Sequence, residues 1–208
     1  MDLMNAQNQA IVTNLYAARE GSDAVKRWFS DLKQKSLDPL FVTMDGEQST
    51  MRLLHETWPS ITIQRCLYHI QREGMRWLRS KPKTKAGREL RHLLSTLCGI
   101  RSIKERNQFL RTYRNWLKTY KDYVLSLSMD IKANFDIKRT ISLINNAIPD
   151  MFHYLMDPNV PSTSNMLEGF YSRLKLSYRF HRGLTQRHKI QFLKWYCYYE
   201  NQQKTNKI

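Results

Sequence analysis

The chain has 208 residues, of which 41% are hydrophobic, and its 34 Lys and Arg outnumber its 18 Asp and Glu to give a net charge of +16. This hydrophobic content excludes a disordered chain, and no stretch approaches the ~20 apolar residues that a membrane-spanning helix needs. The excess basic charge lies after residue 64, and a field of that sign attracts polyanions, so the expected partner is a nucleic acid.

Cysteine content and the first residues bear on the cellular compartment. Three cysteines, Cys66, Cys98 and Cys197, are too few for a disulfide framework. The N-terminal residues lack the basic segment and the apolar run of a secretory signal. We therefore expect a cytoplasmic protein with no membrane partner.

Residues 1–65 combine strand and helix signals. The turn-prone residues 5–8 and a β-like run at 10–17 predict a hairpin whose first strand is cut short at Met1. Ser22 is the expected N-cap of an amphipathic helix, because apolar residues follow it at helical spacing: Val25, Trp28, Phe29 and Leu32.

Two further strands are expected in this part of the chain. The first, at 40–44, is apolar except for Thr43 and predicts a buried strand, and the second, at 61–63, alternates. A short helix at 48–57 lies between them. Strands that alternate with helices indicate an α/β fold class.

From residue 66 onward, helical periodicity replaces the strand signals. Two apolar stripes at helical spacing predict helices here, and Pro149 ends the second one. The first stripe contains Phe109, Leu110, Tyr113, Trp116, Leu117, Tyr120 and Val124, and the second contains Ile137, Ile141, Ile144 and Ile148. A basic loop at 80–85 and a break at 158–162 interrupt the helices.

Two more helices, at 165–178 and 185–201, are expected after this break. The layout predicts three segments. They are a β/α core at 1–65, a helical insertion at 66–160, and closing helices at 161–208.

Asp45 is the first candidate for chemistry. It follows the 40–44 strand directly, where ligands and metals gather in α/β sheets, and Gly46 allows the backbone to turn sharply after it. Taken alone, the Asp-Gly pair favours an ordinary turn over a catalytic role.

Glu168 is the second candidate. It lies beside the apolar stripe of the 165–178 helix and is not in the middle of its polar face. A structural alternative stands beside this interpretation, because Glu168 would close a capping box if Asn165 were the N-cap.

Cys66 and His69 form a C-x2-H pair directly after the 61–63 strand. A zinc site needs four ligands, and no second pair follows at usable spacing. We therefore interpret these two residues as supporting the site, with His69 as a hydrogen-bonding residue near it, and we assign Asn165 to the same supporting group.

Basic and aromatic residues alternate densely in two stretches, a pattern typical of nucleic-acid binding, because cations neutralise phosphates and aromatic rings stack on bases. The chain has no nucleophile elbow, phosphate-binding loop or metalloprotease motif. The expected DNA-binding residues are Arg72, Arg76, Arg79, Arg173, Lys175, Arg179, Arg182 and Arg187.

Several short motifs in this order resemble one known family. The chain is similar to the Mutator-like (MULE-type) DDE transposases of bacterial insertion sequences over nearly its whole length. The motifs are the run Phe41–Gly46, Trp58-Pro59, the run Ile63–Arg72 with its C-x2-H pair, the run Thr163–Phe170 with Asn-x-x-Glu, and His181-Arg182-Gly183-Leu184.

This resemblance implies an RNase H-like fold with a large all-helical insertion before the last catalytic carboxylate. By the resemblance, Asp45 is the second catalytic Asp and Glu168 the closing Glu, and both hold divalent cations, Mg2+ by preference. The implied activity is DNA transposition by two-metal phosphoryl transfer. The implied partners are transposon ends and target DNA, with a homo-oligomer in the transposition complex.

The sequence departs from the family pattern at its beginning. The first catalytic Asp of the family belongs on an earlier strand, and Asp2, the only early candidate, does not fit that role. We therefore expect an N-terminally truncated core that is inactive alone and still binds DNA non-specifically. A non-catalytic DNA-binding module remains an alternative, and an RNase H-like nuclease or resolvase is a less favoured one.

Overall fold

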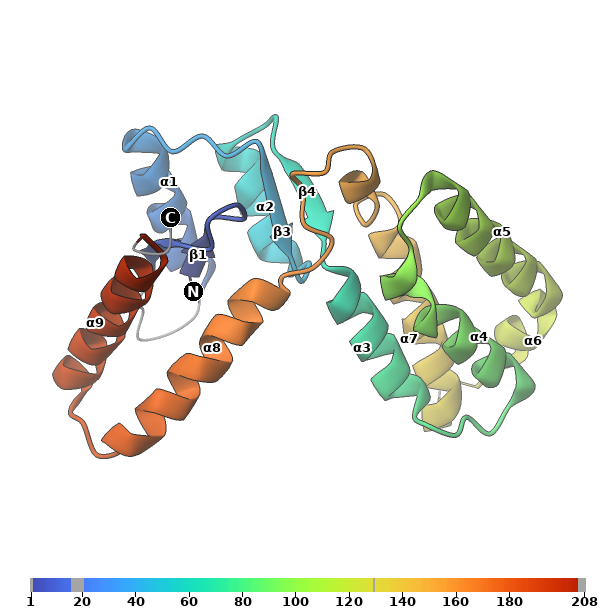
Figure 1. The fold of residues 1–208 in the computed structure, drawn as a ribbon. Coiled ribbons are helices and arrows are strands. Elements are labelled where there is room, and N and C mark those ends of the chain that lie inside the picture. Colours follow the sequence, from blue (N-terminus) through green and yellow to red (C-terminus); the bar gives the residue numbers. More distant parts are fainter. Residues whose placement is uncertain (1, 16–20, 129, 206–208) are drawn as a thin grey trace. The chain divides into compact units, whose positions relative to one another are not determined.

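The structure is a computed structural model that describes residues 2–15, 21–128 and 130–205 (Figure 1). It is a mixed α/β structure in which helices dominate and the described strands form two small sheets. The chain divides into two compact units. The terminal unit comprises Met1–Leu40, Glu47–Ile61 and Ser164–Ile208, and the central unit comprises Phe41–Gly46 and Thr62–Thr163.

The terminal unit contains an antiparallel hairpin, as the sequence predicts, and two pairs of helices. The pairing of the hairpin strands is irregular after Leu3. The elements are β1 (Asp2–Met4), β2 (Ile11–Asn14), α1 (Ser22–Gln34), α2 (Gln48–Thr57), α8 (Asn165–Tyr178), the 3-10 turn η3 (Arg179–His181) and α9 (Gln186–Thr205).

Aromatic side chains pack α1 against the end of α2. The Phe29 and Trp58 ring centroids are 5.5 Å apart, and the Trp58 indole N–H donates to the Leu37 carbonyl at 2.9 Å. The four apolar residues predicted to face the core from α1 are all buried. Helical spacing therefore identified this contact face correctly.

A second apolar cluster joins the hairpin to α8 and α9. Its buried members are Ile11, Phe170, Leu174 and Cys197. The backbone of Ile11 exchanges two hydrogen bonds with the Asn201 amide, at 2.8 and 2.9 Å. These contacts attach the short hairpin, which would be only marginally stable alone, to two long helices.

The central unit starts with two parallel strands and continues as a helical bundle. In the sheet, Met44 pairs with Arg65 at the carboxyl ends of the strands. The elements are β3 (Phe41–Met44), β4 (Thr62–Arg65), α3 (Leu67–Leu78), α4 (Lys85–Ser95), η1 (Leu97–Gly99), α5 (Ile103–Thr119), α6 (Lys121–Ser126), α7 (Lys132–Ala147) and η2 (His153–Leu155).

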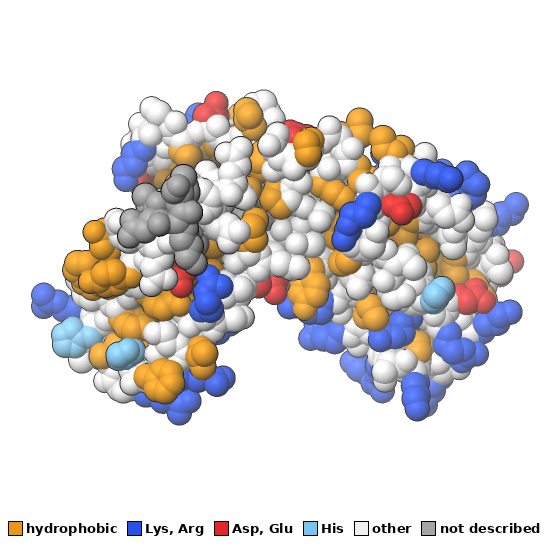
Figure 2. Space-filling model, in the orientation of Figure 1, with side chains coloured by type: hydrophobic (Ala, Val, Ile, Leu, Met, Phe, Trp, Pro, Cys, Tyr) orange, Lys and Arg blue, Asp and Glu red, His pale blue; other side chains and the backbone are white. Residues whose placement is uncertain are grey.

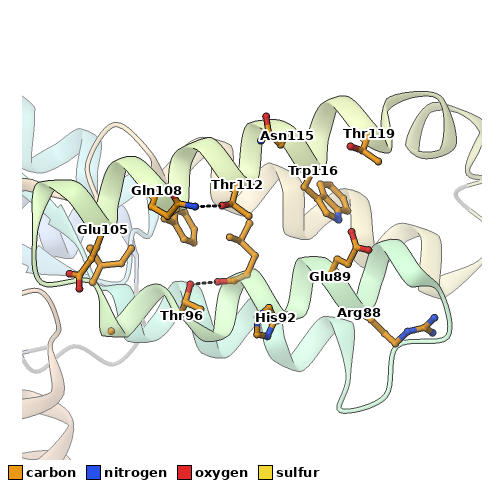
Figure 3. A pocket seen from close by; sticks show the side chains of 14 residues that line it. Arg88, Glu89, His92, Thr96, Glu105, Gln108, Thr112, Asn115, Trp116 and Thr119 are labelled. Carbon is orange, nitrogen blue, oxygen red and sulfur yellow. Dashed lines mark hydrogen bonds between the residues drawn. The ribbon is translucent and has the colours of Figure 1, made fainter.

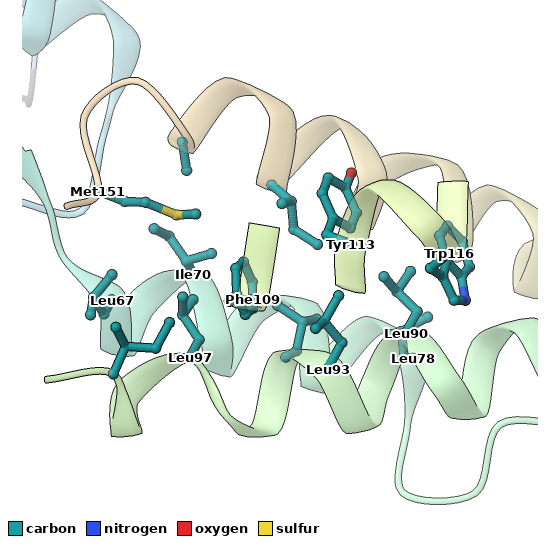
Figure 4. Close-up of a cluster of buried hydrophobic side chains, with 14 of the residues drawn as sticks. Leu67, Ile70, Leu78, Leu90, Leu93, Leu97, Phe109, Tyr113, Trp116 and Met151 are labelled. Atoms are coloured by element: carbon teal, nitrogen blue, oxygen red, sulfur yellow. The ribbon is translucent and has the colours of Figure 1, made fainter. Parts of the chain in front are cut away.

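The largest hydrophobic core lies within this bundle (Figure 4). Leu67, Leu90 and Ile144, from three different helices, are completely buried in it. The Trp116 indole N–H finds a partner inside the core, the Ala86 carbonyl at 3.1 Å. Both apolar stripes predicted from the sequence contribute to this core, because each one forms the buried face of its helix.

Local details differ from the sequence expectations. Gly21, and not Ser22, is the N-cap of α1, and the 40–44 strand is only half buried, with Leu40 80% exposed. The apolar composition of this strand therefore overstated its burial. Residues 16 and 17 of the predicted hairpin strand lie outside the described residues.

Candidate active site

Asp45 lies directly beyond the carboxyl end of β3, and its side chain is exposed. The strand end is held in place because the Cys66 N–H donates to the Met44 carbonyl at 2.7 Å, continuing the parallel pairing by one residue. The carboxylate therefore stands at the edge of a small parallel sheet, which is the position that the sequence predicted for it.

Gly46 is required by the geometry of this strand end. Its φ of +90° lies in the left-handed region, which residues with a Cβ rarely adopt. A Cβ built on Gly46 would also overlap Nε and Cζ of Arg65. Two independent constraints, one on the backbone and one on packing, therefore exclude other residues at this position.

Arg65 is the buried cation of the site. It ends β4 and is only 4% exposed, and its guanidinium lies over Gly46. Burial lowers the pKa of Arg65, because desolvation disfavours the charged form, and the carboxylates of Asp150 and Asp45 act in the opposite direction. Arg65 thus brings a positive charge to the candidate catalytic carboxylate.

The Arg65 guanidinium is poorly satisfied by hydrogen bonds. Within the described part of the chain, Nε and Nη1 are buried and have no hydrogen-bond partner. Buried polar groups in folded proteins are nearly always paired, so an exception of this kind calls for a reason beyond packing.

Backbone and side-chain bonds fix the end of β4 more completely. The Arg65 N–H donates to the Asp150 carbonyl at 2.7 Å, and the Gln64 amide donates to the Arg65 carbonyl at 2.7 Å. Gln64 is fully buried and accepts from the Tyr154 N–H at 3.2 Å. The segment after α7 therefore holds the strand end that carries Arg65.

Cys66 and His69 follow this strand end at the start of α3. Cys66 is fully buried and is the N-cap residue, while His69 is half-buried one turn later, with its ring edge-on to Tyr68 at 6.2 Å. The C-x2-H spacing thus places both side chains in the first turn of α3, in the same unit as Asp45. Their supporting role stays a prediction.

Glu168 belongs to α8 in the terminal unit, where it is half-buried. The helix begins at Asn165 as predicted, with Ser164 as its N-cap, so the alternative in which Asn165 is the N-cap is wrong. Glu168 therefore stands one position beyond the capping-box residue, and its N–H donates to the Ser164 carbonyl at 3.1 Å. Glu168 therefore does not close a capping box with Asn165, and its catalytic role stays a prediction.

Asp2, the early carboxylate, has a partner of its own. The Tyr171 hydroxyl of α8 donates to its carboxylate, and burial, together with this bond, raises the pKa of Tyr171. Asp2 therefore ties β1 to α8.

A family comparison decides what kind of protein carries these residues. A protein-family model described as Transposase, Mutator family, matches residues 5–140. The chain belongs to the Mutator family of transposases. The matched segment includes Asp45, Cys66 and His69, and Glu168 lies beyond it. No curated protein and no solved structure matched the chain.

The fit of a metal centre to this transposase chain depends on its donor set. Asp45 offers an exposed carboxylate, the oxygen ligand that hard cations prefer. Among the residues that the structure describes, however, no group of three or more His, Cys, Asp or Glu side chains could hold a metal ion. The described residues therefore do not assemble a complete metal centre.

The basic residues predicted to contact DNA are exposed in both units of the transposase. Arg72, Arg76 and Arg79 lie on α3 and at its C-terminal end, near the 80–85 loop, and Figure 2 shows Lys and Arg side chains gathered in this region. The others lie on α8, η3 and α9 or between them, and are Arg173, Lys175, Arg179, Arg182 and Arg187.

Two of these basic residues have acidic partners within their own units. Arg76 is 2.5 Å from Glu73, and Arg173 is 3.2 Å from Glu200. Arg72 lies over the Tyr68 ring, with its guanidinium carbon 5.3 Å from the ring centroid. Exposed pairs of this kind are weak and can exchange one partner for a phosphate at little cost.

A groove of about 940 Å³ lies between α4 and α5 (Figure 3). Phe109 and Trp116 contribute to its apolar wall, and Glu89, His92 and Thr112 contribute polar groups. None of the predicted site residues lines it.

In the described parts of the chain, no helix combines the length and apolar character needed to cross a bilayer.

Arg65 is the residue beside the candidate site that sequence reasoning missed. It stands inside the motif run that carries the family resemblance, yet no role was assigned to it. The available signal was a charged residue at the end of a strand that is otherwise apolar on alternate positions. Its placement over Gly46 depends on strand pairing, which local patterns do not reveal.

Proposed function

We propose that this chain serves in DNA transposition as the catalytic domain of a DDE transposase with an RNase H-like core. The observation that carries the proposal is the exposed Asp45 carboxylate at the carboxyl end of a parallel strand pair, in a chain of the Mutator transposase family. That position is where ligands bind in open α/β sheets.

In this proposal, Asp45 and Glu168 are the carboxylate ligands of divalent cations. Such cations activate the attacking oxygen and stabilise the leaving oxygen in an in-line displacement at phosphorus. The protein residues position the carboxylates: the β3–β4 pairing and the Gly46 turn direct Asp45, and the first turns of α8 carry Glu168. Cys66 and His69 are assigned a supporting role at the start of α3.

DNA binding follows from charge. The central-unit segment 62–163 carries 19 Lys and Arg against 8 Asp and Glu, and its basic residues on α3 are exposed. Phosphate contacts of this kind supply most non-specific affinity and position the DNA. We propose Arg72, Arg76 and Arg79 as one DNA-contacting group and the basic residues from Arg173 to Arg187 as another.

The test is Mn2+ binding to the complex of the 208-residue chain with duplex DNA, measured by electron paramagnetic resonance. We expect Asp45→Asn and Glu168→Gln each to weaken this binding by at least about tenfold, because each removes a charged oxygen ligand. Asp157→Asn, at an exposed turn, is the matched control and should change nothing.

A second readout is nicking of supercoiled plasmid in Mg2+ or Mn2+. Any nicking by the wild-type chain should disappear in both ligand variants. The competing function is a DNA-binding module without catalysis. It expects DNA binding that is unchanged in both variants, and Mn2+ binding that depends on neither carboxylate.

A further inference from the structure

The proposed function gives no role to Arg65, the buried arginine near Asp45. A fixed positive charge next to a carboxylate does not increase the affinity of that carboxylate for divalent cations. Yet the Arg65 guanidinium is held in the same unit, against Gly46 and within electrostatic reach of Asp45 and Asp150.

Packing and stability give no sufficient reason for an arginine at this position. The residue is 4% exposed, and two of its nitrogens have no hydrogen-bond partner in the described part of the chain. Leaving buried donors unpaired costs free energy. A buried charge is also weak evidence for a stabilising role, because its desolvation penalty can exceed the Coulombic gain. Stability alone therefore does not account for an arginine at this position.

The position of the charge is nevertheless closely controlled. Arg65 is register-paired with Met44, the residue before Asp45, and its backbone N–H is anchored to the Asp150 carbonyl at 2.7 Å. The guanidinium occupies the space that a Cβ at position 46 would fill. These features fix the guanidinium against Gly46, the residue after Asp45, where the carboxylates of Asp150 and Asp45 both act on it.

We propose that Arg65 is a positioning residue that serves as the internal counter-ion of Asp45 and thereby weakens divalent-cation binding at that carboxylate. The inference rests on the proposed role of Asp45 as a metal ligand. A like charge close to a cation site raises the dissociation constant, because the two cations repel each other. Binding at Asp45 then becomes tight only when further negative groups, such as DNA phosphates, are present.

The experiment measures Mn2+ affinity of the full chain without DNA, at low ionic strength, by electron paramagnetic resonance of free Mn2+. We expect Arg65→Met to tighten binding by about tenfold, the order that loss of one nearby charge produces in a partly solvated site. Arg65→Lys keeps the charge and should leave the affinity near that of the wild type. In Asp45→Asn/Arg65→Met the gain should vanish.

Arg114→Met is the charge-matched control, because Arg114 is exposed on α5. Thermal unfolding of each variant separates folding from binding, and Arg65→Gln replaces Arg65→Met if the methionine variant does not fold. If both uncharged variants fail to fold, Arg65 is structural and the inference is wrong.

The remaining outcomes separate this inference from the proposed function. If Asp45→Asn abolishes Mn2+ binding but Arg65→Met does not tighten it, the counter-ion role is wrong and the ligand role stands. The inference is also wrong if Arg114→Met tightens Mn2+ binding as much as Arg65→Met, because the net charge of the chain would then explain the change in affinity. If Asp45→Asn has no effect in either background, both the ligand role and the counter-ion role are wrong.

Discussion

The Arg65 guanidinium lies over the α-carbon of Gly46, at the carboxyl ends of two parallel strands. The guanidinium can approach this closely because Gly46 has no Cβ, and a Cβ at this position would overlap Nε and Cζ of Arg65. This pair therefore couples the turn after Asp45 to the end of the neighbouring strand.

Gly46→Ala should destabilise the chain by about 2 kcal/mol or more, because it adds left-handed backbone strain and an overlap with Arg65. Urea unfolding measures this change. In the double variant Gly46→Ala/Arg65→Met, the steric part should be partly relieved while the backbone strain remains, so the two changes should be non-additive. A single Gly46→Ala variant as stable as the wild type would contradict the geometry.

Asp136 and Arg139 on α7 form a largely buried ion pair in the central unit. Arg139 Nη2 is 2.6 Å from Asp136 Oδ1, Asp136 is 3% exposed, and the guanidinium lies 4.2 Å from the Trp77 ring centroid on α3. Asp136→Ala should cost about 2 kcal/mol, because it leaves a largely buried cation without its partner.

Glu73→Ala provides the comparison for Asp136→Ala. It removes the Arg76–Glu73 pair, whose arginine side chain is 68% exposed. A pair so well solvated should contribute no more than about 0.5 kcal/mol. Both variants can be compared by chemical denaturation, and equal losses would show that burial of the Asp136 pair does not matter.

Glu47 predicts a pH-dependent contribution to the stability of α2. Its carboxylate caps the helix by accepting from the Ser49 and Thr50 N–H groups at 3.0 and 2.7 Å. Hydrogen bonds from Thr50 and Ser49 lower its pKa from 4.5 to about 2. A lowered folded-state pKa means that the stabilisation is present above the unfolded value and is lost as the pH falls through the folded value.

Wild type should therefore exceed Glu47→Gln in stability by about 1 kcal/mol at neutral pH, the usual size of an N-cap effect. The difference should shrink between pH 4.5 and about 2. Urea unfolding over this range measures it, and Glu56→Gln on the same helix is the control. A difference that stays constant with pH would rule out a charged cap.

DNA binding by the α3 group should be visible in its salt dependence. Each phosphate contact contributes about 0.9 to the slope of log affinity against log salt concentration. Replacing Arg72, Arg76 and Arg79 together by Ala should lower that slope by roughly 2 to 3 in fluorescence-anisotropy titrations, if each residue contacts a phosphate.

The matched control for this triple variant removes the same charge from α1. Lys26, Arg27 and Lys35 are exposed there and were not predicted to contact DNA. If both triple variants lower the slope equally, net charge and not the α3 surface accounts for binding.

The amino-acid sequence by itself determined the family and the positions of most elements. The motif run through Asp45, Cys66 and His69 carried the resemblance that the family match confirmed, and helical spacing placed α2 and α8 at their observed bounds. Periodicity and turn chemistry act between residues a few positions apart, so they can be recognised without knowledge of the fold.

Only the tertiary structure decided what surrounds Asp45. Strand pairing brings Arg65 over Gly46, and the segment after α7 supplies Asp150 to the same place. These contacts join residues that are distant in the chain and depend on how the strand ends and the bundle pack together. The sequence therefore identified a carboxylate at a strand end, and packing revealed the buried cation that accompanies it.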